Sequence, residues 1–377
     1  MKFRSTVGQA PMVGFCEALL QGIAPDGGLY VPEKFPSVDL TDFAGASTPA
    51  QVGAIMLAPF ARGSQLEGSL PVICQEAFSF PIPLKSIPSD AGPLHVLELF
   101  HGPTAAFKDV GARFLAACFE RLNGSEQLPL TILVATSGDT GGAVAAAFHG
   151  RANTRVVVLF PKGLVSGRQE KQLCCWGDNV LSLRVNGNFD DCQRMVKQAF
   201  ADAKFNQAVR LSSANSINLG RLLPQAVYYA CASLNYWRAT GEKLNFVIPT
   251  GNLGNGQACV WAKTMGFPIG KIVFATNENR PIPDYLETGN WAPGASVATL
   301  ASAMDVGNPS NMERLRDLLP DVGKMRAAVS AYPVSDEDIR RQISRDEVAR
   351  GETWCPHTAT AAHVYDGFSE TEKAQSW

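Results

Sequence analysis

The sequence predicts an α/β fold built on mostly parallel sheets. Two observations support this prediction: short apolar runs of strand type recur along the chain, and helical stretches separate several of them. Continuous apolar runs are typical of strands buried on both faces, as in parallel sheets with crossover helices. The runs lie at residues 94–100, 130–135, 155–160, 180–185, 244–249 and 271–276, and the clearest helical stretches lie at 190–204 and 222–237.

The length of the chain predicts more than one domain. A chain of 377 residues with 46% hydrophobic content can bury more than one core, and chains above about 250 residues usually divide. A stretch rich in proline and glycine at residues 81–93 marks a boundary near residue 90. We therefore expect an N-terminal subdomain at 1–90 and two α/β domains at 91–225 and 226–377, with approximate boundaries that the chain can cross.

Charge, cysteine content and hydropathy narrow the classes of function. Lysine and arginine number 33 against 35 aspartates and glutamates, which argues against partners such as nucleic acid or an anionic membrane. Nine scattered cysteines, with no Cys-x-x-Cys spacing and no grouping with the five histidines, favour free thiols in a reducing compartment over disulfides or a metal site. The N-terminus lacks the apolar core of a secretory signal, and runs such as 156–160 are far shorter than the ~20 residues of a membrane span. We expect a cytoplasmic protein.

Lys108 has the surroundings of a reactive amine. It follows a turn at Gly102 and Pro103 and a run of small and apolar residues, and it precedes a helical pattern through Phe114. A lysine among apolar neighbours loses hydration and holds its proton less tightly, and such an amine can form a Schiff base with an aldehyde. The alternative is a solvated lysine at the start of a helix.

Two loops that follow predicted strands have the composition of anion sites. Residues 136–142, Thr-Ser-Gly-Asp-Thr-Gly-Gly, join a strand to a small-residue helix, where exposed N–H groups suit a carboxylate or phosphate; ordinary capping by Ser137 or Asp139 explains the same residues. Residues 250–256, Thr-Gly-Asn-Leu-Gly-Asn-Gly, lack the Gly-Lys-Ser/Thr ending of a Walker loop. Their glycines allow close backbone approach and their asparagines can donate, so they predict an anion cradle, with a plain turn as the alternative.

Two further segments carry cations that suit a phosphate. Residues 212–221 place Asn215, Ser216 and Arg221 before an apolar helix. An arginine fork suits a phosphate dianion; otherwise Asn215 or Ser216 simply caps the helix and Arg221 lies on its surface. Lys162 follows another predicted strand, and its residues alone indicate a solvated loop lysine.

These segments together resemble the threonine synthases, which belong to the tryptophan-synthase-β-like, fold type II group of pyridoxal-phosphate enzymes. The resemblance is carried by Glu-Leu-Phe-His-Gly-Pro-Thr-Ala-Ala-Phe-Lys-Asp-Val-Gly-Ala at residues 98–112 and by the two glycine-containing loops. Residues 24–32, 215–221, 304–314 and 356–359 are similar to family segments in the same order, so the likeness covers nearly the whole chain.

The resemblance implies a cofactor, pyridoxal 5'-phosphate, held between the two α/β domains, and a role for each site residue. It implies that Lys108 bonds the cofactor, that the 251–255 loop holds its phosphate, and that Thr358 meets the pyridine nitrogen. It also implies that residues 137–140 face the substrate carboxylate and that 162, 215, 216 and 221 meet the substrate phosphate. The residues so implied are Lys108, Gly251, Asn252, Leu253, Gly254, Asn255 and Thr358 for the cofactor, and Ser137, Gly138, Asp139, Thr140, Lys162, Asn215, Ser216 and Arg221 for the substrate.

The implied reaction is the conversion of O-phospho-L-homoserine and water to L-threonine and phosphate by a monomer or homodimer. One alternative stays within the cofactor class, a threonine or serine dehydratase-like lyase, which needs no second anion clamp. Another is a non-catalytic binder of phosphate ligands that kept the fold.

The chain departs from the family pattern at two places. Cys355 stands where the family usually has aspartate before Pro-His-Thr-Ala. The chain stops at Trp377, whereas the family usually continues with a further strand. We therefore expect a truncated sequence with reduced stability or an exposed sheet edge.

Overall fold

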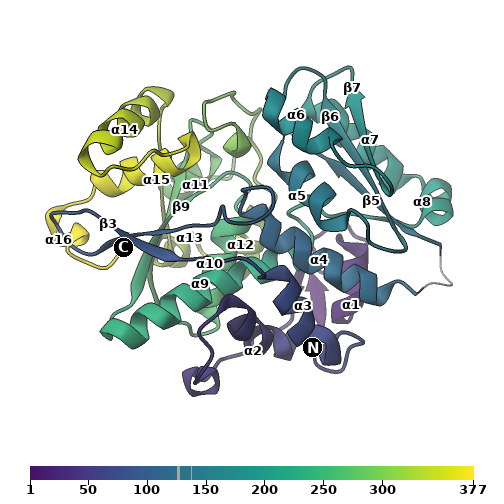
Figure 1. The fold of residues 1–377 in the computed structure, drawn as a ribbon, viewed down its shortest axis with the longest axis horizontal. Helices are drawn as coiled ribbons and strands as arrows, with labels where there is room; N and C mark the ends of the chain where they lie inside the picture. The colour runs from purple at the N-terminus through teal and green to yellow at the C-terminus, as the bar shows by residue number, and fades with distance from the viewer. Residues whose placement is uncertain (125–127, 137) are drawn as a thin grey trace. The chain divides into compact units, whose positions relative to one another are not determined.

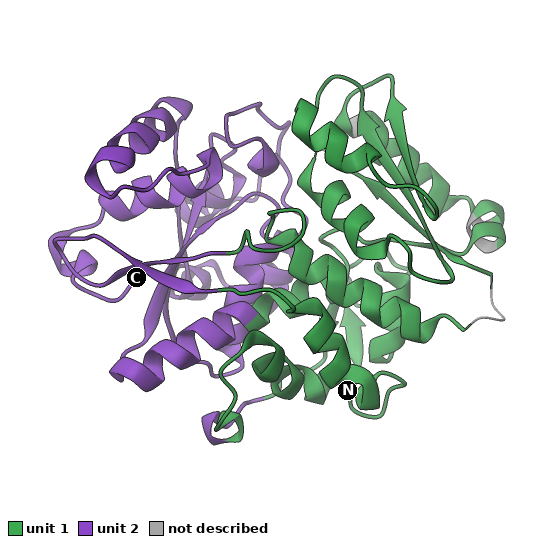
Figure 2. Ribbon diagram, viewed as in Figure 1, with its two compact units in different colours: residues 1–36, 42–82, 99–227 green, residues 37–41, 83–98, 228–377 purple. Residues whose placement is uncertain are grey.

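The structure, a computed structural model, describes residues 1–124, 128–136 and 138–377. The chain divides into two compact units, each made of segments that are not contiguous in sequence (Figure 2). Unit 1 comprises Met1–Pro36, Asp42–Ile82 and Leu99–Val227, and unit 2 comprises Ser37–Thr41, Pro83–Glu98 and Tyr228–Trp377. The domain ranges 1–90, 91–225 and 226–377 stay a prediction.

Unit 1 is built on a four-stranded parallel sheet, as the apolar runs predict. Its strands are β5 (Leu130–Ala135), β6 (Thr154–Pro161), β7 (Val180–Val185) and β8 (Leu211–Ser212), in the order β7-β6-β5-β8 (Figure 1). The helices that precede or separate them are α4 (Lys108–Leu122), α5 (Asp139–Phe148), α6 (Gly167–Cys174), α7 (Phe189–Ala201) and α8 (Ala203–Val209). Cys192 and Val196 of α7 pack on Leu133, Ala135 and Leu159 of the sheet, and this burial fixes α7 on one face.

The N-terminal part of unit 1 is held by one aspartate in its Asp-Gly-Gly turn. Asp26 accepts hydrogen bonds from Ser5 Oγ (2.7 Å) and from the backbone N–H groups of Ala10 (2.7 Å) and Gly28 (3.0 Å). A Cβ at Gly28 would lie 2.1 Å from Ser5 Oγ, so only glycine fits there. The elements around this turn are β1 (Phe3–Ser5), α1 (Phe15–Gln21), β2 (Tyr30–Pro32), η1 (Leu40–Phe43), α2 (Pro49–Ala61), η2 (Glu67–Ser69) and α3 (Leu70–Ala77).

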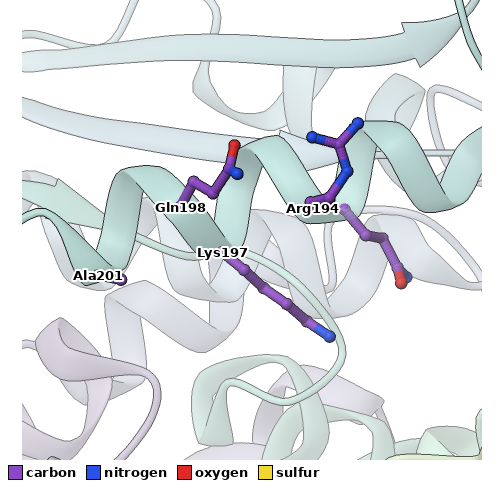
Figure 3. A pocket seen from close by; sticks show the side chains of 5 residues that line it. Arg194, Lys197, Gln198 and Ala201 are labelled. Atoms are coloured by element: carbon purple, nitrogen blue, oxygen red, sulfur yellow. The ribbon is translucent and has the colours of Figure 1, made fainter.

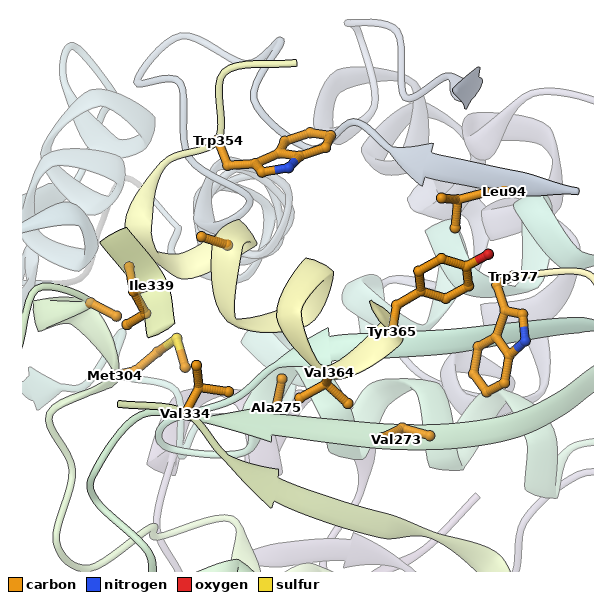
Figure 4. Packing of buried hydrophobic residues seen from close by; sticks show 12 residues of the cluster. Leu94, Val273, Ala275, Met304, Val334, Ile339, Trp354, Val364, Tyr365 and Trp377 are labelled. Carbon is orange, nitrogen blue, oxygen red and sulfur yellow. The ribbon is translucent and has the colours of Figure 1, made fainter. Parts of the chain in front are cut away.

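Unit 2 contains a three-stranded parallel sheet in the order β11-β10-β9, with β9 (Leu244–Pro249), β10 (Ile269–Thr276) and β11 (Ser330–Pro333). Figure 4 shows its core, where Val364 of α15 lies against Val273 and Ala275 of β10. The helices of this unit are α10 (Gly254–Thr264), α11 (Pro281–Thr288), η3 (Ser302–Met304), α12 (Met312–Leu318), α13 (Val322–Ala328), α14 (Asp336–Ala349), α15 (Pro356–Asp366) and α16 (Glu370–Lys373).

Two sequence expectations need correction. The run at 94–100 is not part of a parallel sheet: β4 (Leu94–Leu97) ends early and pairs antiparallel with β3 (Leu84–Ile87). The predicted helix 190–204 is interrupted at Asp202, whose side chain accepts a hydrogen bond from the N–H of Phe205 and thereby starts α8. In the second case a local contact ends the helix before its apolar pattern does.

Trp377 packs inside unit 2. Its backbone N–H donates to the Pro93 carbonyl (3.1 Å) and its carbonyl accepts from the N–H of His95 (2.8 Å), so it borders β4. Its indole is 5% exposed and lies 4.7 Å, centroid to centroid, from the Phe368 ring.

Helix α9 (Leu219–Thr240) contains the boundary between the two units, after Val227. Although α9 is 22 residues long, no helix in the part of the chain that the structure describes is apolar enough to cross a membrane.

Candidate active site

Lys108 is the first residue of α4 and its side chain is only 16% exposed. The amine lies 5.6 Å from the centroid of the Phe107 ring and 4.0 Å from Asp139 Oδ2. Burial lowers the pKa of Lys108 below its ordinary value; the Asp139 carboxylate opposes this shift, and the Arg221 guanidinium adds to it. The solvated-lysine alternative is therefore wrong, and the amine has the partial desolvation that a nucleophile and proton carrier needs.

Asp109, which the sequence analysis missed, shapes the turn before Lys108. Its carboxylate is 1% exposed and accepts from the backbone N–H (2.9 Å) and the hydroxyl (2.7 Å) of Thr104. A Cβ at Gly102 would come within 2.5 Å of Asp109 Oδ2, which explains the glycine. The signal in the sequence was a threonine directly after the turn and an acid five residues later.

The predicted carboxylate loop lies at the start of α5, after β5. Thr136 Oγ1 accepts from the N–H groups of Gly138 (3.0 Å) and Gly141 (2.9 Å), so Thr136 organises this turn. Gly138 has a φ of 149° and makes no side-chain cap, while Asp139 and Thr140 begin the helix. Asp139 is the first residue of α5 and therefore does not cap this helix, as the capping alternative had it. Ser137 lies outside the described residues.

Arg221 is 2% exposed, so its surface alternative is wrong. One of its Nη atoms donates to the Ala214 carbonyl, whereas its Nε has no hydrogen-bond partner among the residues that the structure describes. Burial lowers the pKa of Arg221 to about 10, with the Asp109 carboxylate opposing. A buried guanidinium with an unpaired N–H is suited to an anion, and Gly111 allows its approach, because a Cβ there would lie 2.7 Å from the Arg221 carbonyl oxygen.

The polar residues before Arg221 form a fixed loop. Asn218, rather than Asn215 or Ser216, caps α9: its Oδ1 accepts from the N–H of Gly220 (2.8 Å). Asn215 and Ser216 are partly buried, and the Asn215 carbonyl accepts from the Asn218 N–H (3.0 Å). Lys162 is exposed just beyond β6, with its backbone N–H donating to Val185.

The predicted phosphate loop of unit 2 lies at the carboxyl end of β9. Leu253, 2% exposed, adopts a φ of 62° as the residue before α10 and provides no side-chain cap. The first N–H groups of α10, from Gly254 and Asn255, thus lack both intrahelical acceptors and a side-chain cap. Such a helix start is suited to an anion.

Hydrogen bonds from two other segments hold this loop in place. Asn255 Oδ1 accepts from the hydroxyls of Tyr228 and Tyr229, which leaves its Nδ2 to donate elsewhere. Asn252 Oδ1 accepts from the Ser310 N–H (2.6 Å), and the Asn252 carbonyl accepts from Asn311 Nδ2 (3.1 Å). The Pro-Ser-Asn segment at residues 309–311 therefore supports the loop. Gly251 is required because a Cβ there would lie 2.6 Å from the Met304 Cα.

Thr358 lies in the first turn of α15, three residues after Cys355, which precedes that helix. Cys355 Sγ is 3.5 Å from Thr358 Oγ1. Burial raises the pKa of the Cys355 thiol, but hydrogen bonds with His357 and Thr358 outweigh burial and lower it to about 7. His357 itself accepts from the Ala303 N–H through Nε2 (3.1 Å), which is a structural contact.

Two further observations concern a surface hollow and the side chains that can bind metal. A shallow hollow along α7, lined by Gln193, Arg194, Lys197, Gln198 and Ala201 (Figure 3), contains none of the predicted site residues. In the described ranges of the chain, no group of three or more histidine, cysteine, aspartate or glutamate side chains could hold a metal ion.

Comparison with known proteins identifies the family. The sequence profile described as "Pyridoxal-phosphate dependent enzyme" matches residues 81–375, and that described as "Threonine synthase N terminus" matches residues 2–78. The threonine synthase of Escherichia coli K12 is 39% identical over 370 residues, covering 96% of this chain and 83% of that protein. The chain belongs to the threonine synthase family.

Further comparisons agree with this assignment. The threonine synthase of Haemophilus influenzae is 39% identical, covering 93% of this chain and 81% of that protein. The crystal structure of pyridoxal-phosphate-bound threonine synthase from Brucella melitensis superposes with a TM-score of 0.90 at 35% identity, covering 98% of this chain and 86% of that one.

Membership of the threonine synthase family confirms the expected α/β fold and pyridoxal-phosphate cofactor. The chain is a pyridoxal-phosphate-dependent carbon–oxygen lyase, and the dehydratase alternative is not favoured. The residues present fit the cofactor, since Lys108 is a partly buried amine and α10 begins with uncapped N–H groups.

Proposed function

We propose that this chain converts O-phospho-L-homoserine and water to L-threonine and phosphate. Within the threonine synthase family, the observation that most supports this substrate is Arg221, a buried guanidinium whose Nε lacks a partner among the described residues. A buried, incompletely paired cation is costly unless an anion completes it. A phosphate ester supplies a dianion, whereas serine and threonine do not, so Arg221 favours the phosphorylated substrate over those of a dehydratase.

The proposed cofactor contacts are made by one amine, one loop and one hydroxyl. Lys108 would hold the cofactor covalently through Nζ. The loop at residues 251–255 would hold its phosphate through backbone N–H groups, and the Thr358 hydroxyl would meet the pyridine nitrogen. Bound pyridoxal phosphate supplies the conjugated ring that takes up the electron pair left when a C–H bond next to the substrate amine breaks.

The substrate contacts that we propose lie in unit 1. The N–H groups at the start of α5, in residues 139 and 140, suit the substrate carboxylate, and Ser137 and Gly138 belong to the same proposed set. Arg221 would receive the phosphate with Asn215 and Ser216, and Lys162 would add a further cation. The carboxylate and the phosphate of the substrate would thus be held by separate donors. Holding both ends orients the carbon chain between them, and such orientation is how positioning groups accelerate a reaction.

Lys108 is the proposed proton carrier. Because its pKa is lowered by burial, a larger fraction of the amine is neutral near neutral pH than in a solvated lysine. Once released from the cofactor, neutral Nζ would accept the proton from the α carbon and, after giving that proton up, the proton from the β carbon. Phosphate leaves from the γ carbon with the electron pair of the C–O bond. The two protons are returned at the γ carbon and the α carbon, while the hydroxyl of water adds at the β carbon and the remaining proton of that water goes to solvent.

The proposal is tested by incubating the purified holoenzyme with O-phospho-L-homoserine and measuring phosphate and L-threonine. Equal amounts of both products are expected, and Lys108→Ala should abolish product formation together with the visible absorbance of the bound cofactor. Phosphate without threonine, or 2-oxobutyrate formed from threonine at a higher rate, would instead support the eliminating lyase.

We further propose that the protein acts in the cytoplasm, as a monomer or homodimer, on small molecules alone and without nucleic acid. The near balance of 33 basic and 35 acidic residues supports the last point. Light scattering of the purified protein would distinguish the two oligomeric states.

A further inference from the structure

Within the described part of the chain, the Asp139 carboxylate lies near an amine and an amide. Its Oδ2 lies 4.0 Å from Lys108 Nζ, while its Oδ1 accepts a hydrogen bond from Gln169 Nε2 at 2.9 Å. The side chains of Lys108 and Asp139 are 16% and 32% exposed, so solvent screens the pair only in part. One oxygen therefore faces the amine and the other is tied to a neutral amide.

Gln169 cannot easily turn its amide around. It is the third residue of α6, and its Oε1 accepts from the Ser166 N–H (3.2 Å) and from Ser166 Oγ (3.0 Å), which together form a capping box. With the oxygen end used by the cap, the Nε2 end must face Asp139. A Cβ at Gly138 would lie 2.4 Å from this Nε2, so glycine at 138 is what admits the Gln169 amide.

An aspartate side chain is a poor group to receive a substrate carboxylate, because like charges repel. The backbone N–H groups of the same turn can bind that carboxylate without the Asp139 side chain. We propose that Asp139 is instead the anionic partner of the Lys108 amine, and that Gln169 is a positioning residue that holds Asp139 in this place. This inference rests on the proposed function for its catalytic meaning, since it adds a residue that adjusts the proton carrier of that reaction.

The charged groups around Lys108 act in opposite directions. Burial lowers its pKa most, the Asp139 carboxylate raises it, and the Arg221 guanidinium lowers it. The Asp109 carboxylate raises the pKa of Arg221 and thereby favours the charged form of that guanidinium. Asp139 therefore keeps the pKa of Lys108 from falling as far as burial alone would lower it, so that Lys108 can both release and accept a proton.

The test uses cofactor-free protein, in which the reactivity of Lys108 can be followed without substrate. Limiting acetic anhydride labels neutral amines, and mass spectrometry gives the extent of labelling of Lys108 at each pH. We expect Asp139→Asn to move the labelling midpoint to lower pH by at least about 0.7, which is the effect of one charge 4 Å away in bulk water, because solvent screens this pair only in part. Gln169→Leu should move it in the same direction by less, because Asp139 is kept but no longer held.

Ser166→Ala is the matched control, since it weakens the α6 cap and leaves Gln169 in the chain. Ser166→Ala should shift the labelling midpoint of Lys108 less than Gln169→Leu does. An equal shift would show that the α6 cap, and not the Gln169 contact with Asp139, sets the midpoint, and would overturn the role of Gln169. An unchanged or higher midpoint in Asp139→Asn would overturn the pairing itself. Because no product is measured, this failure is distinct from failure of the proposed reaction, which would appear as absent threonine in the wild-type assay.

Discussion

Cys355 is a surface thiol with unusual acidity for its position. Since hydrogen bonds with His357 and Thr358 lower its pKa to about 7, its iodoacetamide labelling should rise with pH with a midpoint near 7. The folded-state pKa lies below the ordinary value of 9.0, so the thiolate stabilises the fold; this contribution is complete above pH 9 and is lost as the pH falls through about 7. Peptide mass spectrometry after timed labelling measures the midpoint.

His357→Ala provides the control for this thiol. Loss of the His357 hydrogen bond should raise the midpoint of Cys355 labelling. The exposed Cys174 and Cys175 report general reagent access in the same samples. A midpoint that is the same in wild type and His357→Ala would show that His357 does not set the acidity of this thiol.

Arg221 provides a second prediction at the residue scale. Arg221→Lys keeps the charge but removes the planar fork and the unpaired Nε, so KM for O-phospho-L-homoserine should rise about ten- to a hundredfold, the equivalent of one charge-assisted hydrogen bond. Cofactor affinity should change little. The matched control is Arg184→Lys, at an arginine that is 54% exposed and paired with Glu170. An unchanged KM in Arg221→Lys would remove Arg221 from the substrate site.

Glycines within helices give a prediction at the scale of the element. Gly111 in α4 faces the Arg221 backbone, where a Cβ would meet a carbonyl oxygen at 2.7 Å, whereas Gly167 in α6 has nothing within 4 Å of an added Cβ. Gly111→Ala should therefore lower the free energy of unfolding by about 1–3 kcal/mol, despite the better helix propensity of alanine. Gly167→Ala should leave it unchanged or raise it by up to about 1 kcal/mol. Urea titration of both variants tests this, and equal effects would contradict it.

The elements that the sequence predicted well are those whose contacts follow from local pattern. Strands β5, β7 and β9 have the predicted limits. The apolar runs of β5 and β9 are buried on both faces, whereas β7 lies at the edge of its sheet and exposes Leu181 and Leu183. The pairing of β4 was not predictable, because its partner β3 has only partly buried and exposed residues and no apolar run. The cap at Asp202 was also missed, because the apolar spacing continues across it.

The site follows the same rule. Lys108 and the glycine loops could be found from their own residues and from the family resemblance. Gln169 could not, because its contact with Asp139 joins helices α6 and α5 through side chains 30 residues apart. The burial of Arg221 could not be predicted either, because the residues next to an arginine at a helix start do not show which distant segments pack over it.

Trp377 gives a prediction at the scale of the whole molecule. Its indole is 5% exposed and packs with Tyr365 and Phe368, so Trp377→Ala should lower the free energy of unfolding by about 3–5 kcal/mol. Trp237→Ala, at a side chain that is 39% exposed, should cost far less. Denaturant unfolding followed by circular dichroism measures the free energy of unfolding of both variants. Equal losses would show that burial of the Trp377 side chain does not stabilise the fold.

The discontinuous composition of unit 2 has a consequence for how the protein is made. The β3–β4 hairpin leaves the ribosome early, yet its partners in unit 2, including Trp377, are synthesised much later. At about 5–20 residues per second, Trp377 follows Glu98 by roughly 15 to 60 s. During this delay the nascent hairpin has no core to join, so we expect the yield of folded protein to depend on translation speed and on chaperones that shield this segment.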